Sequence, residues 1–282
     1  MKKTRNKTGF TLIELLVVIS IIALLLSILM PGLSKAKRSA QVVVCGANSH
    51  SISAAAFAFN ASYGKLPVPY HLSGTQFVDI GRCYPFWIQA DDKYMGNGDW
   101  KKYGTSLKTW IDMGASEKVW LCPSQKWLGY ATQWGDNRIV SIEHPYCGVM
   151  YRVPTAYIAG VNYEKNYFND TNPTRKPNVK FLTNVDDKNP SSKIMGGDVV
   201  MYNPPGTAWC WTTVDEYYIN HTVKWGVPYA QNILYGDGSV RNVGAGVWTK
   251  NPITKNNYIK TYTFTGDYLA YMFFGGTDWY SR

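Results

Sequence analysis

One apolar stretch close to the N-terminus constrains this chain more than any other feature. Between Phe10 and Met30 only four side chains are polar, those of Thr11, Glu14, Ser20 and Ser27. As a helix rising about 1.5 Å per residue, the stretch is roughly 30 Å long, enough to cross a bilayer. Lys2, Lys3, Arg5 and Lys7 precede it. Because a basic flank stays on the cytoplasmic side, the sequence predicts one membrane-spanning helix with its N-terminus in the cytoplasm.

Glu14 is the exception inside this apolar stretch. A carboxylate within a membrane-spanning helix costs about 2.5–3.5 kcal/mol even on the insertion scale that gives the lowest values. We therefore expect Glu14 to have a partner that itself arrives in the membrane. Until that partner arrives, we expect Glu14 to be protonated or to reach toward the lipid headgroups.

The residues around Gly9 form a specific motif. Lys7-Thr8-Gly9-Phe10-Thr11-Leu12-Ile13-Glu14, with the apolar span that follows, resembles the N-terminus of type IV pilins and type II secretion pseudopilins. The resemblance implies that residues 1–9 are a leader cut between Gly9 and Phe10. It also implies N-methylation of the new Phe10 amine, a role for Glu14 in assembly, and a helix kink at Pro31.

The same resemblance implies a location and a set of partners. A pilin-like subunit sits in the bacterial inner membrane as a single-pass protein with a periplasmic C-terminal domain. It then enters a filament in the periplasm or at the cell surface. The implied partners are a prepilin peptidase with its methylase, an inner-membrane assembly platform, other pilin-like subunits and membrane lipid. In a filament, the Phe10 amine of one subunit and Glu14 of the next would offset each other's cost in lipid.

An ordinary signal peptide or plain anchor is the simpler alternative for the N-terminus. A signal peptide has an apolar core of about 7–15 residues, followed by a small-residue cleavage site. Here the apolar stretch is longer, and the small residue Gly9 precedes it. These two differences favour the pilin-like interpretation.

Charge and cysteine content narrow the function further. The formal net charge is +10, of which the leader holds four charges, and no Lys/Arg block is typical of nucleic-acid binding. The odd number of cysteines predicts at most two disulfides within one chain of an exported domain, with one thiol left over. The sequence does not select a pairing among them: Cys45, Cys83, Cys122, Cys147 and Cys210.

The apolar helix is predicted to continue past the membrane. Pro31 and Gly32 should bend or loosen it, after which small and apolar residues recur every three or four positions to Ala58. Tyr63-Gly64 and then Pro67 end the pattern, which gives one helix of about 50 residues. The predicted organisation is a leader at 1–9, a transmembrane and polymerisation helix at 10–30, its amphipathic continuation at 31–63, and an exported β-rich domain at 64–282.

The remainder reads as strands and loops, so we predict an α+β fold with the long helix packed on an antiparallel sheet. Short helices are predicted at Pro85–Tyr94 and Ser106–Asp112, a loop at Asn166–Asn178, and a hairpin turn at Gly236-Asp237-Gly238. The predicted strands are Lys118–Leu121, Arg138–Ile142, Val149–Val153, Ala156–Val161, Lys193–Tyr202, Ala230–Tyr235, Ser239–Val243 and Tyr258–Phe264.

A weaker resemblance extends into this region. Some large pseudopilin-like proteins have a Lys-Leu-Pro segment, a Cys-Pro pair, a Tyr-x-x-Asn-like strand, a Pro-Ser-Lys run leading to Asp, and a late His followed by Asp-Gly. Their spacer between His and Asp-Gly is usually nine residues, whereas fifteen separate His221 from Asp237 here, which puts the role of His221 in doubt. The corresponding segments are Lys65-Leu66-Pro67, Cys122-Pro123, Tyr157–Asn162, Pro190–Asp198 and His221 with Asp237-Gly238.

Three polar residues of the soluble part are candidates for chemistry. Asp198, His221 and Asp237 would form a hydrolase or cation site if they converged, but we predict that the aspartates cap turns and that His221 bonds the backbone. Calcium at Asp237 is an alternative, although no dense Asp/Asn loop supports it. Aromatic residues, 15% of the chain, leave open a membrane-anchored or filament-tip polysaccharide-binding module. Without a catalytic fingerprint, the sequence favours a non-enzymatic subunit without a cofactor over an anchored hydrolase.

Overall fold

The computed structural model describes residues 11–67, 87–89, 106–124, 140–144, 148–152, 155–157, 159, 181–203, 216–224, 227–246, 259–263 and 268–272. Helix α1 spans Leu12–Tyr63, a total of 52 residues, and continues without a break through Pro31. It ends at Gly64, whose positive φ of 71° and N–H bond to the Asn60 carbonyl are typical of a helix C-terminus. The long helix is confirmed, while bending at Pro31 stays a prediction.

The chain divides into two compact units, Met1–Ala40 and Gln41–Arg282. The first unit holds the apolar part of α1, and the second holds the rest of α1 together with all the strands. The second unit makes the fold α+β and pilin-like.

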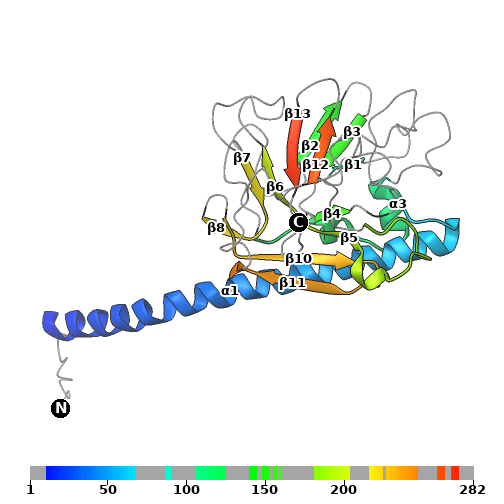
Figure 1. Cartoon of the computed structure of the whole chain (residues 1–282). Helices are drawn as coiled ribbons and strands as arrows, with labels where there is room; N and C mark the ends of the chain where they lie inside the picture. Colours follow the sequence, from blue (N-terminus) through cyan, green and yellow to red (C-terminus); the bar gives the residue numbers. More distant parts are fainter. Residues whose placement is uncertain are drawn as a thin grey trace, which may run out of the picture. The chain divides into compact units, whose positions relative to one another are not determined.

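The named strands of the second unit pair with one another antiparallel (Figure 1), and an isolated parallel bridge joins Phe181 to Ile194. One sheet has the order β1-β3-β2, from Trp87–Gln89, Gly148–Arg152 and Val140–His144. A second has the order β11-β10-β5-β4, from Val240–Gly244, Ala230–Tyr235, Ile194–Asp198 and Thr155–Tyr157. A third has the order β12-β13-β6-β7, from Ile259–Thr263, Tyr268–Met272, Val200–Asn203 and Glu216–Ile219. A ribbon pairs β8 (Thr222–Lys224) with β9 (Val227–Pro228).

The later part of α1 packs against the second sheet. In Figure 1, β10 and β11 run beside the later part of α1. The Asn232 side-chain amide on β10 donates to the Val42 carbonyl at 2.9 Å, and a Cβ built on Gly46 would lie 3.6 Å from Asn232. The core beneath combines one face of α1 with aromatic and aliphatic side chains from the sheet and short helices. Its buried members are Ile52, Ala55, Ala56, Leu66, Leu107, Trp110, Ala115, Trp120, Tyr157, Ala159, Leu182, Met195 and Leu234.

The turn between β10 and β11 confirms the predicted hairpin. Gly238 has a φ of 81°, and its N–H donates to the Tyr235 carbonyl at 2.9 Å. The Asp237 carboxylate accepts from the Ser239 N–H at 2.9 Å, which closes the turn locally. Helix α3 (Leu107–Asp112) is also confirmed, with Ser106 as its N-cap accepting from the Thr109 N–H.

Four strand or helix predictions differ from the structure. The helix predicted at Pro85–Tyr94 is wrong, because Trp87–Gln89 form β1 and pair with β3. The strand predicted at Lys118–Leu121 is wrong, because Glu117–Trp120 form the 3-10 helix η3, which buries Trp120 completely. The run Lys193–Tyr202 is not one strand, since β5 and β6 join different sheets on either side of Val199. Strand β4 spans Thr155–Tyr157, so it overlaps the strand predicted at Ala156–Val161 in two residues, and positions 158, 160 and 161 lie outside the described residues.

Other strand predictions hold at β2, β3, β10, β11 and β12 within a residue or two. Strands β7, β8, β9 and β13 were not predicted, since they are short or poorly alternating. The loop predicted at Asn166–Asn178 lies outside the described residues.

Candidate functional site

The start of α1 places Glu14 in a reciprocal capping arrangement with Thr11. The Thr11 N–H and hydroxyl donate to Glu14 Oε2 at 2.8 and 2.7 Å, and the Glu14 N–H donates to Thr11 Oγ1 at 3.2 Å. This is a capping box, in which two side chains satisfy backbone donors that the first helical turn leaves free. Glu14 therefore has a partner within its own chain, which we did not predict. The Thr-x-x-Glu spacing was the signal that would have revealed it.

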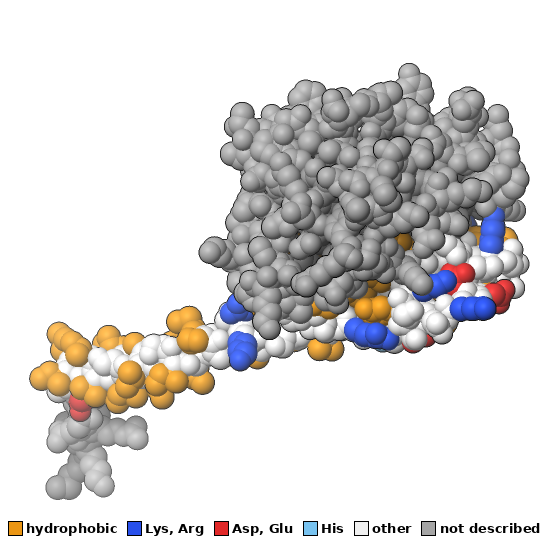
Figure 2. Space-filling view, viewed as in Figure 1, with side chains coloured by type: hydrophobic (Ala, Val, Ile, Leu, Met, Phe, Trp, Pro, Cys, Tyr) orange, Lys and Arg blue, Asp and Glu red, His pale blue; other side chains and the backbone are white. Residues whose placement is uncertain are grey.

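Gly9 and Phe10 lie outside the described residues, so the cleavage junction stays a prediction. After the junction, α1 is the helix, among the described residues, that is long and apolar enough to cross a membrane. Its most apolar window has a mean hydropathy of 3.0, and none of that window is buried. On the face shown in Figure 2, hydrophobic side chains cover the N-terminal part of the helix. This is compatible with a membrane anchor.

A second candidate site is a buried polar cluster centred on Asp198, the last residue of β5. Asp198 Oδ2 lies 3.0 Å from His221 Nε2 and accepts from the Asn232 N–H at 2.8 Å. The other oxygen accepts from the Asn220 side-chain amide at 3.3 Å. Asp198 and His221 are 1% and 0% exposed. A carboxylate buried to this extent needs partners, and these contacts supply them.

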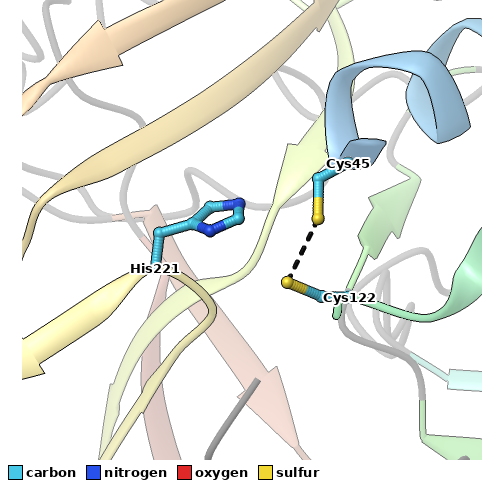
Figure 3. Close-up of side chains that lie close together, drawn as sticks. All are labelled: Cys45, Cys122 and His221. Atoms are coloured by element: carbon cyan, nitrogen blue, oxygen red, sulfur yellow. Dashed lines mark hydrogen bonds between the residues drawn. The ribbon is translucent and has the colours of Figure 1, made fainter. Parts of the chain in front are cut away.

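The cluster continues from His221 to two cysteines. Ser124 Oγ lies 2.6 Å from His221 Nδ1 and 3.1 Å from Cys122 Sγ, and it donates to the Asn220 carbonyl at 3.0 Å. Cys122 Sγ lies 3.1 Å from Cys45 Sγ on α1. Both cysteines are buried free thiols, and the His221 ring faces them (Figure 3).

Burial and neighbouring polar groups both shift the pKa values of His221, Cys122 and Cys45, and for the first two their effects are opposite. Burial lowers the pKa of His221, but the Asp198 carboxylate and the Cys122 sulfur more than offset it, so the pKa lies above its usual value near 6.5. Burial raises the pKa of Cys122, yet the Cys45 thiol, the His221 ring and the Ser124 hydroxyl bring it below its usual value. The pKa of Cys45 is raised, because this thiol donates to Cys122 and is itself buried.

The hydrogen bonds argue against a hydrolase at this cluster. The Ser124 hydroxyl has one proton, and the Asn220 carbonyl accepts it. His221 Nδ1 is then the donor to Ser124, which agrees with a pKa raised by Asp198. A nucleophilic serine needs the opposite arrangement, in which the ring accepts the hydroxyl proton. The cluster therefore reads as a structural network.

The third predicted residue does not join this cluster. Asp237 is exposed in the β10–β11 turn, and the bond it accepts comes from Ser239 two residues away. The hydrogen bond from Ser239 lowers the pKa of Asp237. The predicted turn-capping role is confirmed for Asp237 but wrong for Asp198, which ends strand β5 and holds buried polar groups. The prediction that His221 bonds the backbone is also wrong, because its ring lies between the side chains of Asp198 and Ser124. Sequence reasoning missed Ser124 and the contact between Cys45 and Cys122.

Comparison with known families decides the identity of the N-terminus. Residues 4–30 match the family described as the prokaryotic N-terminal methylation motif. The N-terminus of this chain carries the methylation motif of type IV pilin-like proteins. Comparison with curated proteins gave no match, and comparison with solved structures gave none.

The motif covers the N-terminal candidate site and does not reach the buried cluster around Asp198. The motif implies processing by prepilin peptidase and assembly with other pilin subunits. The match ends at residue 30, so the late His221 to Asp237-Gly238 motif stays a resemblance.

Proposed function

We propose that this protein is a structural subunit of a type II secretion pseudopilus or a type IV pilus-like filament. The observation that carries the proposal is the methylation motif at residues 4–30, which includes the start of an apolar helix whose membrane-length window has no buried side chain. Prepilin peptidase cuts between Gly9 and Phe10, and its methylase modifies the Phe10 amine. The subunit itself catalyses no reaction and needs no cofactor.

The location follows from the charge pattern of the N-terminus. The basic leader stays in the cytoplasm and the domain enters the periplasm, so the subunit waits in the inner membrane as a single-pass protein. An assembly platform then moves it from lipid into the filament, where other pilin-like subunits cover the apolar helix. The dispersed positive charge of the mature chain supports no nucleic-acid partner.

Assembly exchanges one partner of Glu14 for another. In the free subunit, Thr11 holds the Glu14 carboxylate through two hydrogen bonds of 2.8 and 2.7 Å. In the filament, the methylated Phe10 amine of the neighbouring subunit supplies a positive charge at that carboxylate. The donors of Thr11 carry no net charge, whereas the amine is a full positive charge, and the attraction between opposite charges is strong where water is excluded. The exchange therefore favours assembly and fixes the register between subunits.

The processing step is tested by mass spectrometry of the mature protein. The expected N-terminus is Phe10 with one added methyl group, and Gly9→Val should block the cut because the peptidase subsite has little room. A mature protein that starts at another residue, or uncut protein within assembled filaments, would contradict this step.

The assembly step is tested with Glu14→Ala and Glu14→Val in cells that lack the wild-type subunit. Both variants should be exported and cut but absent from filaments, since each lacks the charge. Leu15→Ala is the matched control, because it removes apolar volume at the next position and keeps the carboxylate; it should still assemble. If either Glu14 variant entered filaments at the wild-type level, the helix would be only a membrane anchor and the assembly step would be wrong.

A further inference from the structure

We propose that Cys45 and Cys122 form a disulfide bond that fastens α1 to the segment following η3. The bond rests on the proposed function in one respect, since export brings the domain into a compartment where disulfides persist. The two sulfur atoms lie 3.1 Å apart although 77 positions separate the residues in sequence. An S–S bond of about 2.05 Å requires them to approach by about 1 Å.

Two hydrogen bonds from the same face of α1 place the thiols opposite each other. The Gln41 side-chain amide donates to the Pro123 carbonyl at 2.9 Å, and the Asn48 amide donates to the Leu121 carbonyl at 3.1 Å. These two residues and the helix cysteine between them are four and three positions apart, so they share one helix face. They fix the register of the segment against the helix, with one cysteine facing the other.

Closure is a two-electron oxidation, and its electrons pass to a disulfide of a thiol oxidant such as oxidised glutathione. The Cys122 thiolate attacks one sulfur of that disulfide, which forms a mixed disulfide and releases the first thiolate. The Cys45 thiolate then attacks the Cys122 sulfur and expels the second. The two cysteines lose two protons and two electrons, and the oxidant gains them as two thiols. Both sulfurs are buried in the folded domain, so exchange takes place before the segment has closed over the helix.

The position of the bond gives it a mechanical role. Along α1 the first buried side chain is that of Cys45, followed by Ser49 and Ile52. Tension that reaches the domain through the helix acts first on the hydrogen bonds at Gln41 and Val42 and then at Cys45. A covalent bond there prevents the helix from separating residue by residue from the segment after η3, which hydrogen bonds alone would permit.

A bound metal ion is the competing interpretation of the same residues. Ligand atoms of Cys45, Cys122 and His221 lie within 4.8 Å of one another, and this donor set suits zinc. However, Ser124 already lies 2.6 Å from Nδ1 of the ring, and Asp198 lies 3.0 Å from Nε2. A metal would have to displace one of them, whereas the disulfide leaves both in place.

Peptide mapping of the full-length chain in detergent tests the pairing. The reduced chain is refolded with oxidised glutathione, free thiols are alkylated, and unreduced peptides are weighed. The Cys45 peptide should be joined to the Cys122 peptide with the loss of two hydrogens. Alkylation of both cysteines, or joining of Cys45 to Cys83, Cys147 or Cys210, would overturn the proposal. The same mapping on protein from cell envelopes tests export separately, so failure of the proposed function is distinguishable.

Melting temperature with and without reductant tests the contribution of the bond. Reductant should lower the wild-type midpoint by roughly 10 °C. Cys45→Ser, Cys122→Ser and the double variant should share one melting temperature, and reductant should not change it, because each variant lacks the same bond. Ser124→Ala, the matched control, keeps both thiols and should remain sensitive to reductant. One zinc per chain in metal analysis, with thiols that become reactive only after chelation, would overturn the disulfide in favour of a metal site.

Discussion

Among single residues, Asp198 organises the buried part of this protein. It accepts from a backbone N–H and a side-chain amide, and it lies beside a histidine that is completely buried. Those contacts join β5, β10 and the segment between β7 and β8, which come together only in the folded domain. A charge at such a position contributes to the specificity of the fold as long as its partners remain.

His221 should make the stability of the domain depend on pH. Its folded pKa is raised above the ordinary value, so its contribution is complete below about pH 6.5 and is lost as pH rises through the folded pKa. His221→Gln should cost about 3–5 kcal/mol at pH 6 and flatten this dependence. His50→Gln, on the exposed face of α1, is the control and should leave it unchanged. Urea unfolding between pH 5.5 and 9 measures both, and an identical pH slope in the two variants would refute the assignment.

Asp237 should act only in its turn. Asp237→Asn keeps an acceptor for the Ser239 N–H, so the free energy of unfolding should change by about 0.5 kcal/mol or less. Added calcium should leave the melting temperature of the wild type unchanged. A calcium-dependent rise in melting temperature that disappears in Asp237→Asn would instead establish a calcium site.

Between elements, β5 and β10 approach each other closely at Gly197. A Cβ on Gly197 would lie 2.5 Å from the Asn232 carbonyl oxygen and 3.2 Å from Ile233 Cα. Both are backbone atoms of the paired strand, so neither can move without disturbing the sheet. Strand β5 therefore requires glycine at position 197, directly before Asp198.

Gly197→Ala should destabilise the domain by about 1–3 kcal/mol, because it forces β5 away from β10. Gly244→Ala is the matched control: Gly244 is also a strand glycine of the same sheet, and nothing lies within 4 Å of its added Cβ. That change should stay within about 0.5 kcal/mol. Chemical denaturation compares the two, and equal losses would show that the close approach has no energetic consequence.

For the whole molecule, the division into Met1–Ala40 and Gln41–Arg282 separates two tasks. The first unit holds Glu14 and the exposed apolar side chains of the first part of α1. The second unit holds the buried core and the contact between Cys45 and Cys122. Assembly and domain stability should therefore respond to different substitutions.

Glu14→Ala should leave the melting temperature of the domain within measurement error of the wild type, because the side-chain hydrogen bonds of Glu14 go to Thr11 within the first unit. Ile52→Ala, in the buried part of the same helix, should cost about 2–5 kcal/mol. Thermal melting of both proteins in detergent measures the contrast. A domain that melts much lower in Glu14→Ala would mean that the two tasks are coupled.

The sequence by itself determined the features that depend on neighbouring residues. The apolar stretch, the processing motif and the end of α1 at Gly64 each rest on a few adjacent positions, as does the turn at Asp237-Gly238. Helical spacing and glycine at positive φ act locally, so the pattern in the chain is enough to predict them. The capping box at Thr11 and Glu14 is equally local and was overlooked.

Only the tertiary structure decided which distant side chains meet. Ser124 reaches His221 across 97 positions and Asn232 reaches Val42 across 190, and no local pattern encodes such contacts. Burial also overrode local preference at η3, where complete enclosure of Trp120 outweighs the strand-like sequence of Lys118–Leu121. Cys45 meets Cys122 for the same reason: the core of α1 and the sheet brings one helix face against the segment after η3, and composition alone left that pairing open.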